Sequence, residues 1–314
     1  MPKISIIIPV YNAEKYIRRC LDSILNSLGK IKGEIFVVNN NSTDNSPLIL
    51  KEYAKNYPKI ITVLDCKTVG ASAARNMGAT KAKGEYLWFI DADDEISQDA
   101  IPELLKEAGR KNADFVMPGT DKIQENGEKV YLPAISPKDP KFKSKFIRRA
   151  IGPWQIIIRR EWWMKNQFHF KEGIIHEDLE LMPSLILYTD NYASVDKPLY
   201  YYYWNPNSVL HKAKWDPKYF DIFPALEGLY NRFEANLAIK TYHDELEWFF
   251  IWNLLIDSAG DFKKFKEGRS GFKRSREMLR KYFPGWRKNY FLNQKKMGIK
   301  FKLRVLLNYF GITI

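Results

Sequence analysis

Four short apolar runs in the first third of the chain constrain its fold most. Each has the length of a buried strand, and segments with helical spacing of apolar residues separate them. The runs are Ile4–Val10, Glu34–Val38, Ile60–Leu64 and Gly84–Ile90. Because parallel strands cannot be joined by a tight hairpin, strands alternating with helices predict an α/β fold with a parallel sheet. Asn12 is predicted to cap the first of these helices.

The fourth run ends in a cluster of acids, Asp91-Ala92-Asp93-Asp94-Glu95. Carboxylates crowded this closely repel one another unless a cation or strong hydrogen-bond donors compensate them. Oxygen ligands on a loop suit Mg²⁺ or Mn²⁺ holding a phosphate-bearing substrate. A solvated acidic turn, or Asp94 as the cap of the next helix, fits the same spacing, so the cluster alone leaves these interpretations open.

Composition narrows the class of protein. With 45% hydrophobic and 15% aromatic residues in 314, the chain can bury a full core. Cys20 and Cys66 are far apart in sequence, so a disulfide framework is not expected and a reducing compartment fits. Neither a signal-peptide pattern nor an apolar run of about 20 residues, the length of a membrane span, is present. We expect a cytoplasmic protein.

The formal charge of +13 lies in the C-terminal region. Residues 261–314 contain 16 Lys or Arg against three acids, whereas the rest of the chain has 34 of each sign. Residues 299–310 predict a basic amphipathic helix in a membrane interface, or else a solvated helix packed on the domain. We expect an anionic membrane surface as the partner of this tail, and a peripheral position on the inner face of the cell membrane. Nucleic acid is less favoured, because no nucleic-acid-binding module accompanies the charge.

Two later segments carry further candidates. Glu177 and Asp178 open a predicted helix, where acids either serve chemistry or complement the helix dipole. The aromatic run Leu199–Trp204 is followed by His211, and its rings suit a sugar or a core equally well.

Four blocks in this order resemble the family 2 glycosyltransferases with the GT-A fold. The blocks are Ile6–Asn12, Val37–Asp44, Ala73–Asn76 and Phe89–Asp94. A weaker similarity continues through Trp154, Phe170–Gly173 and Glu177–Asp178, which look like the acceptor-side segment. The resemblance implies a Rossmann-like, mostly parallel GT-A sheet flanked by helices. It further implies a domain at 1–215, divided into a nucleotide-sugar-binding half at 1–120 and an acceptor-side half at 121–215, with a helical, basic and aromatic extension at 216–314.

The resemblance also implies roles at the donor. Pro9 and Tyr11 would contact the nucleotide base and ribose, and Arg75 the diphosphate side. The Asp91-Ala92-Asp93 triplet would be the Asp-x-Asp motif, in which Asp91 and Asp93 hold the ribose and a Mn²⁺ or Mg²⁺ ion.

At the acceptor the resemblance implies a base and a binding segment. Asp178 would be the general base that takes the proton from an acceptor hydroxyl, with Glu177 beside it. Trp154 would bind substrate on the acceptor side. A single in-line displacement would invert the anomeric centre.

The chain departs from the family pattern at two segments that the resemblance assigns to the donor site. Asn39-Asn40-Asn41 stands where aspartates usually precede Gly-Ser. Asn40 can still accept the uracil imide N–H, but as a neutral and weaker partner, so a UDP-sugar stays the expected donor. Trp204-Asn205-Pro206 stands where the family often has an arginine-rich stretch, which leaves His211 as a candidate contact of the diphosphate or the cation, or as a structural histidine.

Together these features predict an inverting glycosyltransferase that moves a sugar from a nucleotide-sugar donor to a cell-envelope polysaccharide or lipid-linked acceptor. The alternative is a catalytically lapsed nucleotide-sugar-binding protein docked to a membrane assembly. Retention of Asp91, Asp93, Glu177 and Asp178 argues against that alternative.

Overall fold

The computed structural model describes residues 1–205 and 215–312. The chain divides into two compact units. The described residues of the first unit are 1–142, 151–173 and 188–205, and those of the second are 143–150, 174–187 and 215–312. This division differs from the predicted one at residue 215, since residues 143–150 and 174–187 group with the C-terminal region.

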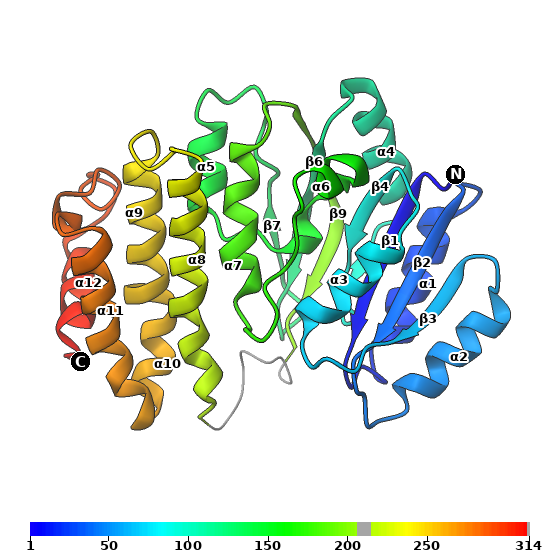
Figure 1. Ribbon diagram of the computed structural model, residues 1–314, viewed down its shortest axis with the longest axis horizontal. Coiled ribbons are helices and arrows are strands. Elements are labelled where there is room, and N and C mark those ends of the chain that lie inside the picture. The colour runs from blue at the N-terminus through cyan, green and yellow to red at the C-terminus, as the bar shows by residue number, and fades with distance from the viewer. Residues whose placement is uncertain (206–214, 313–314) are drawn as a thin grey trace. The chain divides into compact units, whose positions relative to one another are not determined.

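One sheet organises the first unit (Figure 1). Its strands are β1 (Ile4–Val10), β2 (Gly33–Asn39), β3 (Ile61–Asp65), β4 (Tyr86–Phe89), β5 (Glu95–Ile96), β6 (Phe115–Ile123), β7 (Lys129–Leu132), β8 (Ile157–Arg159) and β9 (Tyr192–Tyr203). Among the described residues they follow the order β3-β2-β1-β4-β8-β6-β9-β5, with β7 paired to β6. Most of the residues paired across the sheet belong to parallel pairs of strands. This confirms the predicted α/β fold with its mostly parallel sheet.

Helices join the parallel strands as the alternation predicts. The helices of the first unit are α1 (Ile17–Leu28), α2 (Ser46–Asn56), α3 (Ala71–Lys81), α4 (Ala100–Lys111) and α6 (Arg160–Lys165); α5 (Phe142–Arg148) begins at the unit's boundary. A 3₁₀ turn, η1, spans Pro153–Gln155. Gly78 lets α3 approach the sheet closely, because a Cβ there would clash with the side chain of Ile7.

The parallel strands bring distant loops to one edge of the sheet. Val10 at the end of β1 pairs with Asn39 at the end of β2, and Asn39 pairs with Asp65 of β3. On the other side of β1, Phe89 at the end of β4 pairs with Ile7. The loops that follow β1, β2 and β4 therefore leave the sheet at the same edge, where ligands of open α/β sheets bind.

The second unit is helical, which confirms the predicted helical C-terminal region. Its elements are α7 (Glu177–Leu181), η2 (Met182–Leu187), η4 (Pro217–Asp221), α8 (Ile222–Ala235), α9 (His243–Trp252), a π-helical turn η5 (Asn253–Asp257), α10 (Ser258–Lys264), η6 (Glu267–Arg269), α11 (Ser270–Tyr282), η7 (Trp286–Lys288) and α12 (Ile299–Phe310). Aromatic rings pack between these helices: Phe283, after α11, contacts Tyr230 of α8 and Phe250 of α9. Among the described residues, we find no helix with the length and apolarity that crossing a bilayer requires.

Candidate active site

The acidic loop, residues 91–94, begins directly after β4. The N–H of Ile90 donates to the carbonyl of Ile7 at 3.0 Å, which continues the pairing with β1. The N–H of Asp94 then donates to the carbonyl of Asp91 at 3.2 Å and closes a turn. The turn holds three carboxylates at the edge of the sheet, as the sequence predicts.

Arg75 compensates the first of these carboxylates. Its Nη2 lies 2.8 Å from Oδ1 of Asp91, and its guanidinium carbon lies 5.6 Å from the centre of the Phe170 ring. The Arg75 side chain is 7% exposed and that of Asp91 is 29% exposed. The Arg75 guanidinium therefore lies against the acidic loop, and Asp91 keeps part of its side chain open to solvent.

Asp93 is held from two directions. Nδ2 of Asn205 donates to Oδ2 of Asp93 at 2.7 Å, and Nη2 of Arg19 donates to its backbone carbonyl at 2.6 Å. Burial and then the charge of Asp91 raise the pKa of Asp93, and the Asn205 amide opposes that rise. The raised pKa indicates that burial and the charge of Asp91 outweigh the hydrogen bonds that reach Asp93.

Asp94 ties the acidic loop to β9. It is 1% exposed, and it accepts hydrogen bonds from the Tyr200 hydroxyl at 2.6 Å and from the Tyr203 N–H at 2.9 Å. Burial, followed by the charges of Asp93 and Asp91, raises the pKa of Asp94 well above its usual range. The interpretation of Asp94 as a helix cap is wrong, since residue 99 precedes α4 at the N-cap position.

The residues predicted to contact the nucleotide base and ribose lie at or just beyond the ends of β1 and β2. Pro9 is half-buried in β1, and Tyr11, just beyond that strand, is 61% exposed. Asn40 is buried after β2, where its Nδ2 donates to the carbonyls of Cys66 and Thr68 at 3.2 and 2.7 Å.

The remaining amide oxygen of Asn40 also has a protein partner. Its Oδ1 accepts the N–H of Gly70 at 2.8 Å. The Asn40 side chain thus fixes the loop that leads into α3, the helix that carries Arg75.

Trp154 belongs to an aromatic stack that continues to the acidic loop. Its ring lies 4.6 Å from that of Tyr200 and 5.1 Å from that of Tyr202, nearly parallel to both. Its carbonyl accepts the indole N–H of Trp88, in β4, at 2.8 Å. One face of β9 thus connects Trp154 with Tyr200, which binds Asp94.

The predicted catalytic acids lie in the second unit, in the first turn of α7. Glu177 is buried, and Asp178 is half-buried with its Oδ1 accepting the N–H of Leu179 at 2.9 Å. His176 precedes them at the N-cap, and burial lowers its pKa to about 4, so it is neutral at pH 7. Later in α7, buried Glu180 forms an ion pair at 2.8 Å with half-buried Arg232 of α8, which anchors the helix.

The first unit therefore brings together Arg75, Asp91 and Asp93. At the same edge of the sheet it places Pro9 near the end of β1, and Tyr11 and Asn40 just after β1 and β2. Ala92, between the two acids, is buried at 8% exposure. His211 lies outside the described residues.

Two residues that donate hydrogen bonds to the acidic loop are not predicted from the sequence: Tyr200 in β9 and Asn205 just after it. Tyr200 and Asn205 are separated from the acidic loop by more than a hundred residues. The only signal in the sequence was an aromatic run followed directly by an asparagine.

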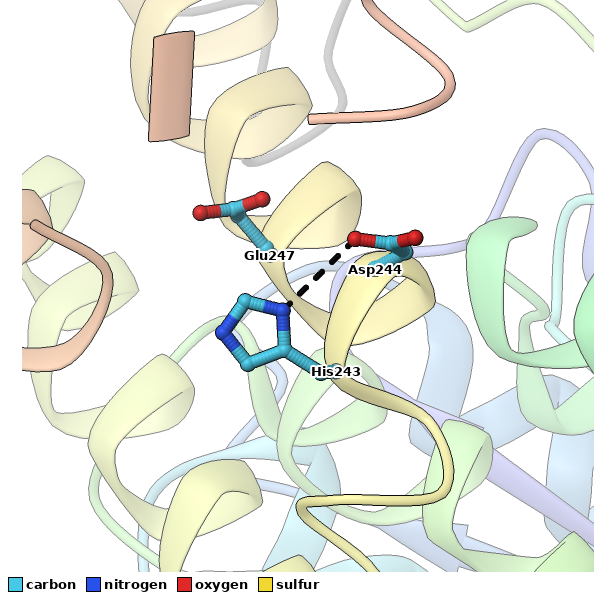
Figure 2. Close-up of side chains that lie close together, drawn as sticks. All are labelled: His243, Asp244 and Glu247. Carbon is cyan, nitrogen blue, oxygen red and sulfur yellow. Dashed lines mark ion pairs between the residues drawn. The ribbon is translucent and has the colours of Figure 1, made fainter. Parts of the chain in front are cut away.

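A second cluster of possible ligands occurs in the second unit, at the start of α9 (Figure 2). One ligand atom from each of His243, Asp244 and Glu247 lies within 4.8 Å of the others. Asn289 already donates to Glu247 Oε2 at 2.8 Å and to the Asp244 carbonyl at 2.9 Å. Acids in the first turn of a helix are also favoured by its dipole, so this cluster has an ordinary structural explanation.

Comparisons with known proteins agree with the geometry. The profile of "Glycosyl transferase family 2" matches residues 5–168. "Uncharacterized glycosyltransferase EpsJ" of Bacillus subtilis is 32% identical over 256 residues, covering 77% of this chain and 71% of that protein. "Poly(ribitol-phosphate) beta-glucosyltransferase" of Bacillus spizizenii is 44% identical over 101 residues, covering 32% of this chain and 16% of that protein. The crystal structure of S. aureus TarS 1–349 in complex with UDP-GlcNAc has the same fold, with a TM-score of 0.73 at 19% identity over 99% of this chain and 88% of that one.

Proposed function

Since this chain belongs to glycosyl transferase family 2, we propose that it transfers a sugar, with inversion, from a nucleotide-sugar donor to a cell-envelope polysaccharide or lipid-linked acceptor. The observation that carries this proposal is the acidic loop at the carboxyl edge of the sheet, where Arg75 pairs with Asp91 and Asp93 lies two residues further on. The diphosphate of a nucleotide sugar is negatively charged. It would bind here to the Arg75 guanidinium and to a metal ion held by the carboxylates.

For the donor we propose a UDP-sugar. The similarity in fold to TarS, whose structure contains UDP-GlcNAc, supports this choice. Pro9 and exposed Tyr11 would contact the base and ribose, Arg75 the diphosphate, and Asp91 the ribose. Asn40 would meet the base only through the second lone pair of its amide oxygen, because Gly70 occupies the first.

For the metal we propose Mn²⁺ or Mg²⁺ held by Asp93 and Asp91. The raised pKa of Asp93 supports a cation at this position, because a positive charge there would stabilise the ionised carboxyl. The structure of PcManGT from Pyrobaculum calidifontis contains Mn²⁺ with GDP-Man, in a chain of related fold with a TM-score of 0.54. When bound, the ion would neutralise charge on the leaving nucleoside diphosphate.

For the acceptor step we propose Asp178 as the general base, with Glu177 as its buried neighbour. Asp178 is half-buried in the first turn of α7, and a carboxylate can accept the proton of an acceptor hydroxyl. Trp154 would offer a ring face to a sugar, and His211 a contact to the diphosphate or cation. The similarity to the poly(ribitol-phosphate) beta-glucosyltransferase supports an acceptor of the cell envelope. For the location we propose the cytoplasm, with the chain as a peripheral protein on the inner face of the membrane.

A transfer assay tests the proposal. The protein is incubated with Mn²⁺ and a panel of nucleotide sugars, with release of nucleoside diphosphate as the readout. We expect turnover with a UDP-sugar that is lost in Asp93→Ala. The control is Glu125→Ala, which removes an exposed acid in the turn between β6 and β7, away from the acidic loop.

The alternative function, nucleotide-sugar binding without turnover, predicts a different result. Calorimetry would then detect tight nucleotide binding, while no acceptor or donor in the panel gives product. That outcome would contradict the transferase proposal and favour a lapsed enzyme.

A further inference from the structure

The last helix of the second unit, α12, presents a row of apolar side chains to solvent. Four large residues at intervals of four, three and four make up this exposed stripe: Ile299, Leu303, Leu306 and Phe310. With 3.6 residues per turn, that spacing places all four on one face of the helix. Their exposed fractions are 85, 51, 36 and 57%. Single exposed apolar residues are ordinary, but a contiguous row marks an interaction surface.

The opposite face of α12 is fixed to the unit, so the stripe cannot turn inward. Val305, Asn308 and Tyr309 are buried. Asn308 donates through Nδ2 to the carbonyl of Leu255 at 2.6 Å, and Arg276 of α11 donates through Nη1 to the carbonyl of Tyr309 at 2.9 Å. The helix is therefore held by one side, which leaves the other side available to a partner. In Figure 1, α12 runs beside α11.

Positive charge borders the exposed stripe. On the helix surface, exposed Lys300 and Arg304 flank it on one side and half-buried Lys302 on the other. Exposed Lys295 and Lys296 precede the helix. From residue 278 to residue 314 the chain contains nine Lys or Arg and no Asp or Glu. An apolar centre between cations is the pattern of a helix that lies in an anionic lipid interface.

We propose that the exposed stripe of α12 is a membrane-binding face, with anionic phospholipid as its partner. The apolar side chains enter the boundary between headgroups and acyl chains, and the flanking cations bind lipid phosphates. Charge disfavours a second copy of the chain as the occupant, because face-to-face pairing would bring the cations of both helices together. The inference adds a lipid-binding surface to the proposed transferase, and binding itself requires no turnover.

Sedimentation with lipid vesicles, without any donor, tests this face in the full chain. We expect binding to vesicles rich in phosphatidylglycerol, weak binding to pure phosphatidylcholine, and a decrease as salt is raised. Leu303→Glu should reduce the partition coefficient more than tenfold. The double variant Lys300→Ser/Arg304→Ser should reduce it about 25-fold, since each cation near an anionic surface contributes about fivefold.

The matched control is Leu237→Glu, which introduces the same charge at an 89% exposed leucine of the same unit, beyond α8. It should bind vesicles like the wild type, and circular dichroism should be unchanged in every variant. Equal vesicle binding by wild type and Leu303→Glu would overturn the proposal. So would a wild-type dimer in solution that Leu303→Glu dissociates, because a second copy would then be the occupant. If the protein binds vesicles but transfers no sugar, the transferase proposal is contradicted and the membrane-binding proposal stands.

Discussion

Replacing Tyr200 by Phe removes one hydroxyl and leaves the ring stacked on Trp154. That hydroxyl donates to Asp94 at 2.6 Å and accepts the N–H of Asp91 at 3.4 Å, so it joins both ends of the acidic loop to β9. Tyr200 and Asp94 are 0% and 1% exposed, so water cannot replace the lost donor. A hydrogen bond to a charged group contributes about 1.5–3 kcal/mol, so we expect the variant to lose about 2 kcal/mol of unfolding free energy at a pH where Asp94 is ionised.

The same substitution has a pH signature. The hydroxyl stabilises the ionised form of Asp94, whose pKa is already raised by burial and by Asp93 and Asp91. The folded state therefore binds the proton of Asp94 more tightly than the unfolded state does. Since Tyr200→Phe raises this pKa further, the destabilisation should be larger at high pH than at low pH, where Asp94 is protonated in both proteins.

Urea denaturation followed by tryptophan fluorescence measures this loss, with Tyr57→Phe as the control. Tyr57 is 40% exposed, and its substitution should leave the midpoint nearly unchanged. A Tyr200→Phe protein as stable as the wild type at every pH would refute the role that we assign to the hydroxyl.

Three further predictions concern residues around the proposed chemistry. Asp178→Asn should lower kcat at least a hundredfold with unchanged donor affinity, since it removes a base but no donor contact; equal turnover would reassign the base. Arg75→Ala should weaken UDP binding about tenfold in calorimetry without preventing folding, because a charge-assisted hydrogen bond contributes about 1.5–3 kcal/mol; Arg18→Ala, at an exposed ion pair, is its control. His176 has a folded pKa of about 4 against about 6.5 when unfolded, so unfolding free energy should fall by about 3 kcal/mol between pH 7 and pH 4. His176→Asn should remove that part of the pH dependence, and an unchanged pH profile would show that another group causes it.

The first half of the fold could be predicted because its signals are local. The predicted ends of the Ile-rich strand β1 and the aromatic strand β4 agree with the structure to within one residue. The helices predicted between the strands require the sheet to be parallel. The acidic loop was predicted for the same reason, since it follows directly from the end of a buried strand.

What could not be predicted depends on pairing between distant segments. The sequence indicated a strand only over Leu199–Trp204, whereas β9 runs from Tyr192 to Tyr203 and supplies the hydroxyl that binds Asp94. Asn12 does not cap α1, which has Tyr16 at its N-cap; with a φ of 48° it accepts the Thr43 N–H and links two loops of the sheet edge. Such contacts leave no periodicity in the sequence.

Binding of UDP with and without Mn²⁺ tests most directly the claim that the acidic loop holds the donor. Isothermal titration calorimetry of the wild type should show UDP binding that strengthens when Mn²⁺ is present. Asp93→Asn keeps the shape of the side chain and removes its charge, and the Mn²⁺-dependent part of the affinity should disappear. If Asp93→Asn binds UDP with the same affinity and the same Mn²⁺ dependence as the wild type, the acidic loop is not the metal-dependent donor site.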